Sequence, residues 1–506
     1  MHITLISPPM VTNEDTYFYI GRRGGPPLNI AYLARIIDNC NVEYDIIDCL
    51  GYDDKNGPIP WKKFFISGLS IDDTVSKIND KTQIVGITAM FTSEWVIVRE
   101  LAKRIKQKFP NILLIVGGEH ATADTDNIMT YDTAIDICFL GESEDSFEFF
   151  IKNFSNHDYL KTPGIAYRNA QGQIIKNPRN KRKKNLDNLL PLWDKIDVNF
   201  YTDRKFSHSR IGKRAMPLLT TRGCPYKCTF CTNEQMWGQT YITRSVESII
   251  YEMKYNIEKY NINHFDLLDL AVSINRRWFI ELNQAIISQL PNITWEATVG
   301  TRSEILDQQV LELLKKSGST TIGVAPEAGS ETMIKKVKKN LNFNNFFQTI
   351  DAAVKIKLDI KANIIIGLPD ETIVEFLSTL LLVCKLGWRG VKGISIFTFI
   401  PFPGSAVAKN YFEPIYKTEV EYEQYVESQA GLGIANVFNI KDIFSHPKKQ
   451  FYAFVSNSMM LFSYFLSMLR RPQYFYQLFR NLKNKEPITS VEVALYFYLK
   501  RLKILR

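Results

Sequence analysis

Short apolar segments alternate with amphipathic helical segments along most of this chain, in two successive blocks. Parallel strands need long crossover connections, so this alternation predicts parallel sheets covered by helices. The blocks span residues 1–155 and 206–410, with a connecting segment at 156–205 and a helical region at 411–506. A chain of 506 residues has room for several domains. We therefore expect an α/β protein with two sheet domains and a helical C-terminal region.

The first block predicts a doubly wound sheet of the flavodoxin or Rossmann type. Its expected helices include Asn29–Ile37 and Ser93–Lys108, and its expected strands are His2–Ser7, Glu43–Asp48, Gln83–Ala89, Ile112–Gly117 and Ile135–Leu140. Ligands of such sheets bind outside the carboxyl ends of the strands, where glycine allows close approach to the backbone. The absence of a Gly-x-Gly-x-x-Gly motif after the first strand argues against dinucleotide binding.

The second block predicts an open or partial barrel of six strand–helix units. Its expected strands are Pro217–Thr221, Phe265–Asp269, Ile293–Val299, Thr320–Ala325, Lys361–Gly367 and Gly393–Ile400, with helices such as Ser245–Tyr260, Asp307–Ser317 and Glu371–Leu386 between them. Barrel enzymes place their active sites at the carboxyl ends of the strands. The residues just after each strand are therefore the candidates for function.

A cysteine-rich loop follows the first strand of this second block. Cys224, Cys228 and Cys231 stand in Thr-Arg-Gly-Cys-Pro-Tyr-Lys-Cys-Thr-Phe-Cys, on a loop that contains Gly and Pro. Three thiolates can hold three irons of a cubane cluster and leave the fourth iron open. Structural zinc needs four protein ligands, and no fourth Cys or His lies nearby in the sequence. The spacing alone leaves zinc and coincidence as alternatives.

This loop resembles the Cys-x-x-x-Cys-x-x-Cys signature of the radical S-adenosylmethionine (radical SAM) enzymes, and Phe230 and the Arg-Gly-Cys-Pro lead-in strengthen the likeness. The resemblance implies a 4Fe-4S cluster bound by Cys224, Cys228 and Cys231, with S-adenosylmethionine on the open iron. It also implies cleavage of S-adenosylmethionine to a 5′-deoxyadenosyl radical. A low-potential electron donor of the flavodoxin or ferredoxin type would then be a partner.

Further features of the second block are similar to this family: Thr301-Arg302, Glu327, Gly367-Leu-Pro-Asp-Glu-Thr372 and Pro401-Phe-Pro-Gly404. The resemblance makes Arg302 and Glu327 candidates for holding S-adenosylmethionine, since arginine can pair with a carboxylate at two points. A salt bridge at the barrel rim is the structural alternative for each. Asp269 is a weaker cofactor-binding candidate, because the family usually shows consecutive acidic residues there. Glu371-Thr372 could equally begin an ordinary helix.

The first block resembles the cobalamin-binding domain found at the N-terminus of many radical SAM enzymes. The matching segments are Pro26–Ala34, Val116–Thr122 and Gly141–Glu144. The resemblance implies that cobalamin is bound by Gly117, Gly118, Glu119, Gly141 and Glu142. The Asp-x-His-x-x-Gly motif that supplies a cobalt ligand elsewhere is absent, so His120 is not assigned to cobalt. A domain of this fold that binds nothing is the alternative.

Composition bears on the cellular compartment of this chain and on whether it binds nucleic acid or membranes. Seven cysteines in a chain of this length do not form a disulfide framework, and the N-terminus lacks a secretory pattern, so a reducing cytoplasm is expected. The basic run Arg179–Lys184 lacks interleaved aromatic residues, which argues against nucleic-acid binding. The apolar run Phe454–Leu469 is short for a membrane span and is followed by basic residues. It is expected to pack against the barrel, with peripheral membrane contact as the alternative.

These features together predict a cobalamin-dependent radical SAM enzyme that methylates an unactivated carbon or phosphorus atom. The expected substrate is a small or lipid-like molecule, and no catalytic side chain stands out from the sequence. A cyclisation, oxidation or rearrangement without methyl transfer is an alternative within the same architecture. A cobalamin or redox sensor that lacks catalysis is the alternative from another class.

Overall fold

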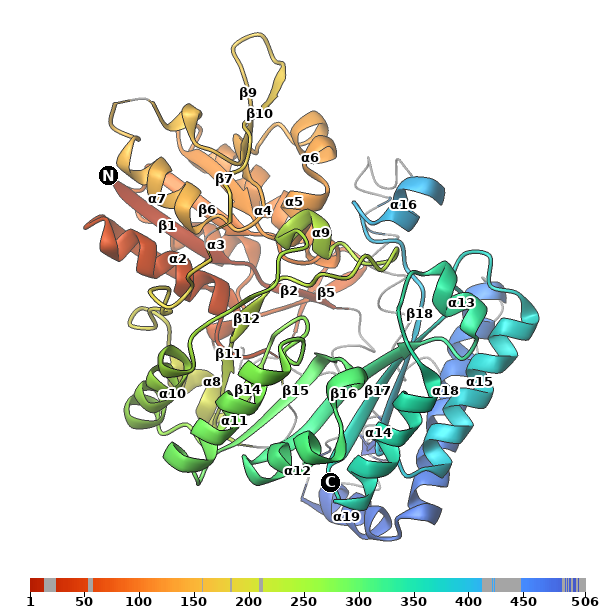
Figure 1. Ribbon diagram of the computed structural model, residues 1–506. Helices are drawn as coiled ribbons and strands as arrows, with labels where there is room; N and C mark the ends of the chain where they lie inside the picture. The colour runs from red at the N-terminus through yellow and green to blue at the C-terminus, as the bar shows by residue number, and fades with distance from the viewer. Residues whose placement is uncertain are drawn as a thin grey trace.

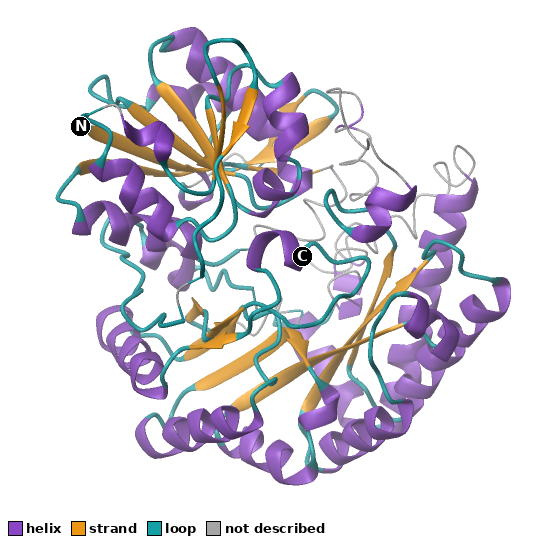
Figure 2. Ribbon diagram, turned by 45° about the horizontal axis from the view of Figure 1, so that its top comes forward, coloured by secondary structure: helices purple, strands orange, loops and turns teal. Residues whose placement is uncertain are grey.

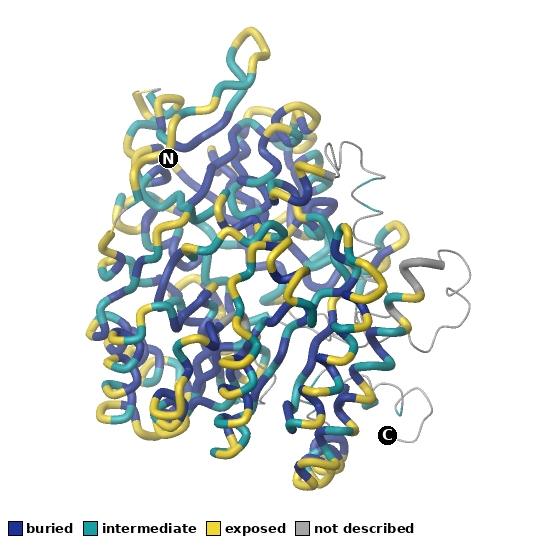
Figure 3. The backbone as a smooth tube through the Cα atoms, turned by 45° about the vertical axis from the view of Figure 1, so that its right-hand side comes forward, coloured by how far each residue is buried: buried dark blue, intermediate teal, exposed yellow. Residues whose placement is uncertain are grey.

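The computed structural model shows two α/β domains side by side, with C-terminal helices packed on the second (Figure 1). It describes residues 1–12, 24–52, 58–156, 158–182, 184–208, 213–411, 421, 423, 447–484, 487, 489, 491–492, 495–496 and 499. The buried strands at the centre of the molecule are dark blue in Figure 3. The helical prediction for most of 412–446 and for 500–506 lies outside the described residues.

The first domain is built on a parallel sheet in the order β3-β1-β6-β7-β8. Its strands are β1 (His2–Ser7), β3 (Glu43–Asp48), β6 (Ile84–Thr88), β7 (Leu113–Gly117) and β8 (Ile137–Phe139), so all the expected strands are present. The strand order reverses between β1 and β6, which makes that pair the switch point where ligands of such sheets bind. The prediction of a doubly wound α/β domain is confirmed.

Helices cover both faces of this sheet because its strands are buried on both sides. Ile3 and Leu5 of β1 contribute to one core, and Ile6 contributes to the other. The first core is covered by α2 (Leu28–Asn39) and α7 (Glu144–Lys152). The second is covered by α3 (Ile71–Ser76), α4 (Trp95–Lys108), α5 (Glu119–Ala123) and α6 (Thr125–Tyr131).

Two antiparallel additions modify this domain. The hairpin β9 (Ile165–Arg168) and β10 (Ile174–Lys176) was expected in the connecting segment, and it extends the first sheet by pairing with β8. The sheet therefore reaches beyond residue 155. A small separate sheet of β2 (Met10–Thr12), β4 (Ile59–Trp61) and β5 (Phe64–Ser67) was not predicted. These strands are three or four residues long, too short to show a clear periodicity.

The second domain is a partial barrel whose six parallel strands follow one another in chain order (Figure 2). The strands are β11 (Ala215–Leu218), β14 (His264–Leu267), β15 (Thr294–Thr301), β16 (Ser319–Glu327), β17 (Asp359–Ile366) and β18 (Gly393–Thr398). The connecting helices include α10 (Val246–Tyr260), α11 (Arg276–Gln289), α12 (Gln308–Lys316), α14 (Phe343–Lys355) and α15 (Ile373–Trp388). β11 and β18 remain at the open edges, so the predicted partial barrel is confirmed.

Two C-terminal helices complete the outer layer beside the last barrel strands, α18 (Pro447–Arg470) and α19 (Gln473–Lys483). The short helix α16 (Ala406–Tyr411) lies instead beside the cysteine loop, where the amide of Val407 donates a hydrogen bond to the carbonyl of Thr229 at 2.9 Å (Figure 1). Ser467 of α18 donates a hydrogen bond to the carbonyl of Val391 at 2.5 Å, so the predicted packing against the barrel holds for one side of this helix. No described helix combines the length and the apolar composition needed to cross a membrane.

Candidate active site

The cysteine loop leaves the carboxyl end of β11 and is fixed at its start by Asp269. One oxygen of this carboxylate accepts hydrogen bonds from the amide of Thr220 at 3.0 Å and from the hydroxyl of Thr221 at 2.6 Å. Burial raises the pKa of the Asp269 carboxyl to about 6. Asp269 therefore positions the chain just before the cysteines, and its suggested contact with a cofactor stays a prediction.

A short β-ribbon then leads into the loop. β12 (Thr221–Arg222) pairs with β13 (Ile242–Thr243), and α9 (Asn233–Trp237) follows the last cysteine. The side-chain amide of Asn233 donates to the carbonyl of Cys224 at 3.1 Å, and its backbone amide donates to the sulfur of Cys231 at 3.5 Å. Asn233 thus ties the two ends of the cysteine loop together.

The three thiols of the loop lie close enough to affect one another electrostatically. Burial, with smaller contributions from the nearby Glu119, Cys228 and Cys224, raises the pKa of Cys231 to about 12. Cys231 is nevertheless exposed at the surface. Its raised pKa describes the free thiol, whereas a bound metal would hold it as thiolate.

A cluster and a single metal ion make different demands on the three thiols. Among the described residues, no three Cys, His, Asp or Glu side chains converge on one metal position. A cubane makes a different demand, since each cysteine binds a separate iron. Three neighbouring thiols on one loop, without a fourth protein ligand, match that demand. The assignment of Cys224, Cys228 and Cys231 as cluster ligands stays a prediction.

Arg302 and Glu327 both lie near Cys228, as predicted from their places after β15 and within β16. Burial raises the pKa of the Cys228 thiol; Lys339 and Arg302 oppose the shift, and Glu327 adds to it. The sequence thus anticipated that these side chains gather beside the cysteines. Lys339 is an addition that it missed, since Lys339 follows a helix and not a strand.

Both candidates are held by neighbouring residues. The guanidinium of Arg302 donates to the carboxylate of Glu304 at 2.7 Å and lies 3.9 Å from the ring centre of Tyr226. Glu327 has a φ of 63° and forms an ion pair with Lys339 at 2.7 Å. The buried Nε of Arg302 has no partner among the described residues. One donor is therefore still available beside the cysteines for a carboxylate such as that of S-adenosylmethionine.

The loop after β7 in the first domain reaches the cysteine loop directly. The carboxylate of Glu119 accepts a hydrogen bond from the hydroxyl of Thr232, the residue after Cys231. Burial raises the pKa of the Glu119 carboxyl. Gly117 ends β7, and Gly118 has a φ of 118°; a Cβ on Gly118 would stand 2.6 Å from the carbonyl oxygen of Ala89. These residues bring the carboxyl edge of the first sheet against the cluster loop.

The loop after β8 also joins the two domains. Glu142 accepts hydrogen bonds from Arg182 of the connecting segment and from Arg222 of β12. Gly141 has a φ of 73°, and a Cβ there would stand 2.9 Å from the guanidinium of Arg179. Gly141 and Glu142, expected to contact cobalamin, thus lie in an arginine-rich contact between the domains.

His120 is buried within the first domain. Nδ1 of its buried ring forms a hydrogen bond with the hydroxyl of Thr92 at 3.1 Å. The centre of the ring lies 5.0 Å from the ring centre of Trp95. Burial lowers the pKa of His120 to about 3, so the ring is neutral. The sequence did not assign His120 to cobalt, and its buried, hydrogen-bonded ring is consistent with that prediction. Phe91, beside the switch point, is 62% exposed and offers apolar surface that a flat corrin ring could cover.

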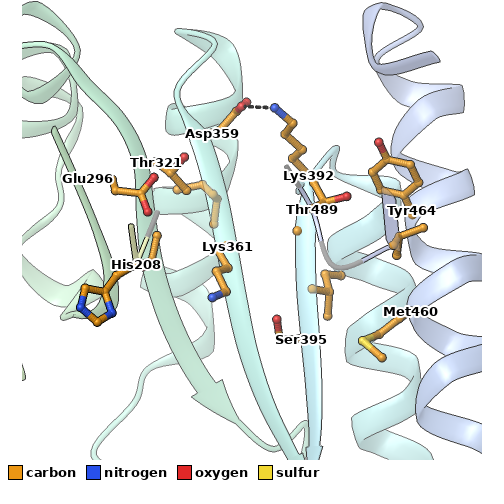
Figure 4. A pocket seen from close by; sticks show the side chains of 15 residues that line it. His208, Glu296, Thr321, Asp359, Lys361, Lys392, Ser395, Met460, Tyr464 and Thr489 are labelled. Carbon is orange, nitrogen blue, oxygen red and sulfur yellow. Dashed lines mark hydrogen bonds and ion pairs between the residues drawn. The ribbon is translucent and has the colours of Figure 1, made fainter. Parts of the chain in front are cut away.

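Two of the cavities that the described residues line lie on different sides of the barrel. One of about 260 Å³ lies between the domains and is lined by Glu142, Arg222 and Trp237 among others. The other, of about 100 Å³, is at the amino-terminal ends of β15 to β18, where Figure 4 shows Glu296, Lys361 and the Asp359–Lys392 ion pair. The second cavity is remote from the cysteine loop, because that loop follows the carboxyl end of β11.

Comparison with protein families assigns both domains. The radical SAM superfamily model matches residues 218–383, and the B12 binding domain model matches residues 23–151. The chain is therefore a radical SAM enzyme that carries a cobalamin-binding domain. Its cofactors are those of these two domains: a 4Fe-4S cluster, S-adenosylmethionine and cobalamin.

Curated relatives place the chain among methyltransferase-like members of this class. An uncharacterized methyltransferase of Pyrococcus horikoshii is 27% identical over 423 residues, which cover 81% of this chain and 84% of the relative. Cytidylyl-2-hydroxyethylphosphonate methyltransferase of Streptomyces wedmorensis is 27% identical over 371 residues, covering 68% and 69%.

Solved structures share the whole arrangement. The cobalamin-dependent S-adenosylmethionine radical enzyme OxsB matches with a TM-score of 0.66 at 13% identity, covering 100% of this chain and 76% of OxsB. The methyltransferase TsrM of Kitasatospora setae matches with a TM-score of 0.64 at 14% identity, covering 81% and 78%. At such identities the likeness supports the fold alone.

Proposed function

We propose that this enzyme transfers a methyl group from cobalamin to an unactivated carbon or phosphorus atom of a small-molecule substrate. The observation that carries the proposal is the contact between Glu119 and Thr232. It brings the carboxyl edge of the cobalamin-binding sheet against the loop that holds the cysteines. A substrate in the space between the domains could then reach both cofactors.

The side chains have separate tasks in this proposal. Cys224, Cys228 and Cys231 hold the cluster, and Arg302 and Glu327 orient S-adenosylmethionine beside Cys228. Gly117 is the last residue of β7 and Gly118 follows it. Neither has a side chain that would obstruct cobalamin at this edge of the sheet. When bound, the cluster supplies the electron that cleaves S-adenosylmethionine, and cobalamin supplies the methyl carrier. A low-potential flavodoxin or ferredoxin would provide that electron.

A radical reaction without methyl transfer is the second candidate. Relatives named anaerobic magnesium-protoporphyrin IX monomethyl ester cyclase also match, one from Rubrivivax gelatinosus being 24% identical over 60% of its length. That name describes ring closure, which needs no net methylation. The pairing of domains alone is compatible with either chemistry.

The deciding experiment analyses nucleoside products by mass spectrometry. The anaerobically reconstituted enzyme would receive S-adenosylmethionine and a low-potential reductant, with and without cobalamin. We expect both 5′-deoxyadenosine and S-adenosylhomocysteine, the latter only with cobalamin. Deoxyadenosine alone would favour the non-methylating candidate. If protein with a full cluster forms neither product, both candidate reactions are refuted and a non-catalytic sensor is favoured.

A further inference from the structure

The outer side of α15 is apolar. Its large exposed residues are Ile373, Val374, Leu377, Leu381 and Trp388, and their exposed fractions range from 51% to 69%. These positions recur at helical spacing and share one side of the helix. The opposite side is buried against the barrel through residues such as Phe376 and Leu382. A helix on the surface of a water-soluble protein normally shows polar side chains outward.

The neighbouring helix α18 repeats this pattern. Its large exposed residues are Phe451, Phe454, Leu461, Phe462, Phe465 and Leu469. They follow the spacing of a single helix side over about five turns. On α19 the exposed large residues are Phe475, Tyr476 and Phe479. We call the combined outer surface of α15, α18 and α19 the aromatic face; these helices stand at the right and lower right of Figure 1.

The inner side of α18 is more polar than its outer side. Ser456, Asn457, Ser463 and Ser467 are all buried there. A Cβ on Gly387 of α15 would stand only 2.6 Å from the carbonyl oxygen of Ser463, so the two helices pack through small residues. Small residues between helices and large apolar residues outside are typical of packing in an apolar medium.

The aromatic face starts at the active-site end of the barrel. Ile373 and Val374 begin α15, just after the Gly367 turn that follows the carboxyl end of β17. The ring of Tyr452 on α18 lies beside that same turn and packs on Phe376, with ring centres 5.6 Å apart. The face then continues along α15 and α18 to α19.

Positive charge accompanies the apolar residues. α18 and α19 contain no acidic residue. Arg470, Arg480 and Lys483 are exposed on them, and none forms an ion pair with a described residue. Such a combination of apolar and basic groups is complementary to anionic lipid, where each basic residue near the surface contributes about 1 kcal/mol.

We propose that the aromatic face docks the enzyme on an anionic membrane surface. The helices would lie in the plane of the headgroups, since none of the described helices can span the bilayer. A second copy of the chain fits less well. A symmetric contact would set the basic residues of α18 and α19 against their own copies, with no acidic residue on either helix to pair with them. The proposal does not depend on whether methyl transfer occurs.

Vesicle flotation of the full-length protein tests this proposal. We expect the protein to float with vesicles of phosphatidylglycerol and phosphatidylcholine and to float far less with phosphatidylcholine alone. The pair Phe462→Ser and Phe465→Ser should weaken binding by at least about tenfold through lost apolar contact. The pair Arg480→Gln and Lys483→Gln should weaken it by about 30-fold at low salt. The matched control is Tyr251→Ser on α10, which is 60% exposed and lies outside the aromatic face.

Thermal melts of each variant separate loss of binding from loss of folding, since the substituted side chains are exposed. Folded wild-type protein that fails to float with anionic vesicles would overturn the proposal. A loss of vesicle binding in Tyr251→Ser equal to that of the Phe462→Ser and Phe465→Ser pair would also overturn the proposal, because it would show that the protein adsorbs without using the aromatic face. Light scattering supplies a third readout: a dimer dispersed by the Phe462→Ser and Phe465→Ser pair would assign the aromatic face to a second copy.

Discussion

Arg222 and Glu142 form an ion pair of 3.0 Å that crosses from the barrel to the cobalamin-binding domain. The same guanidinium lies 2.7 Å from the carboxylate of Glu144, and the rings of Tyr32 and Trp237 lie 5.2 and 5.4 Å from it. Arg222 stands two residues before the first cysteine of the loop. A single buried side chain therefore holds the start of the cluster loop against the edge of the other sheet.

Replacing Arg222 should destabilise the protein strongly. Arg222→Met leaves the partly buried carboxylates of Glu142 and Glu144 beside an apolar side chain, although Glu142 keeps its ion pair with Arg182. Removing one partner of a fully buried pair costs about 3–5 kcal/mol, so we expect a loss of about 2–3 kcal/mol here. Urea unfolding of the complete chain measures the change. The control is Arg276→Ala, whose partner Asp307 is exposed, and it should change stability by less than about 1 kcal/mol. Equal effects of the two changes would contradict the structural role of Arg222.

Removing one cluster ligand should abolish cluster binding without unfolding the protein. For Cys228→Ala we expect loss of the iron–sulfur absorbance and of most bound iron after anaerobic reconstitution. Cys384→Ala, on α15, is the matched control and should bind iron like the wild type. Full iron content in Cys228→Ala would exclude this cysteine as a ligand.

Gly118 is predicted to tolerate no side chain. A Cβ there would meet the carbonyl oxygen of Ala89 at 2.6 Å, in addition to the unfavourable φ of 118°. Gly118→Ala should therefore cost about 3 kcal/mol or more and lower cobalamin retention.

Gly172 supplies the comparison, since it has a φ of 77° but no atom within 4 Å of the place where a Cβ would stand. Gly172→Ala should cost only about 1–2 kcal/mol, the penalty of the left-handed conformation. Thermal denaturation and cobalamin absorbance measure both variants. Equal losses would show that φ alone, and not the approach of Ala89, limits position 118.

Asp269 should make stability depend on pH. Its pKa is about 6 in the folded protein and about 3.9 in an unfolded chain, so the folded state binds the proton more tightly. The resulting stabilisation is complete below pH 4 and is lost as the pH rises through 6. Asp269→Asn keeps the acceptor oxygen but cannot ionise. Between pH 5 and pH 8, the free energy of unfolding of Asp269→Asn should therefore fall by roughly 1–1.5 kcal/mol less than that of the wild type. An equal fall in both proteins would contradict this assignment.

Much of the fold could be predicted because local patterns dictate it. β1 and β3 have the bounds expected from their apolar runs, and each barrel strand lies within a few residues of its expected place. Two features were not predicted: the small sheet of β2, β4 and β5, and the sheet partner of the hairpin β9–β10. The two strands of this hairpin were predicted. Its turn chemistry is local, whereas its pairing with β8 depends on which sheet edge lies near.

Some residues of the candidate site could likewise be predicted from the sequence, and others could not. The cysteine spacing, and the positions of Arg302 and Glu327 after or within barrel strands, are features of the sequence, since parallel strands bring their carboxyl ends to one edge. Lys339 and Tyr226 carry no such pattern, and only packing places them beside Glu327 and Arg302.

The sequence by itself therefore determined the two domain types, because periodicity is a property of neighbouring residues, and its resemblance to known families implied the three cofactors. The assignment of the three cysteines as cluster ligands stays a prediction. Only the tertiary structure decided that Glu119 meets Thr232 and that Glu142 meets Arg222. It also decided that Phe462 and Phe465 of α18 face outward while Ser463 and Ser467 face inward. Such contacts join segments far apart in the chain, and they follow from how whole surfaces pack and not from any local pattern.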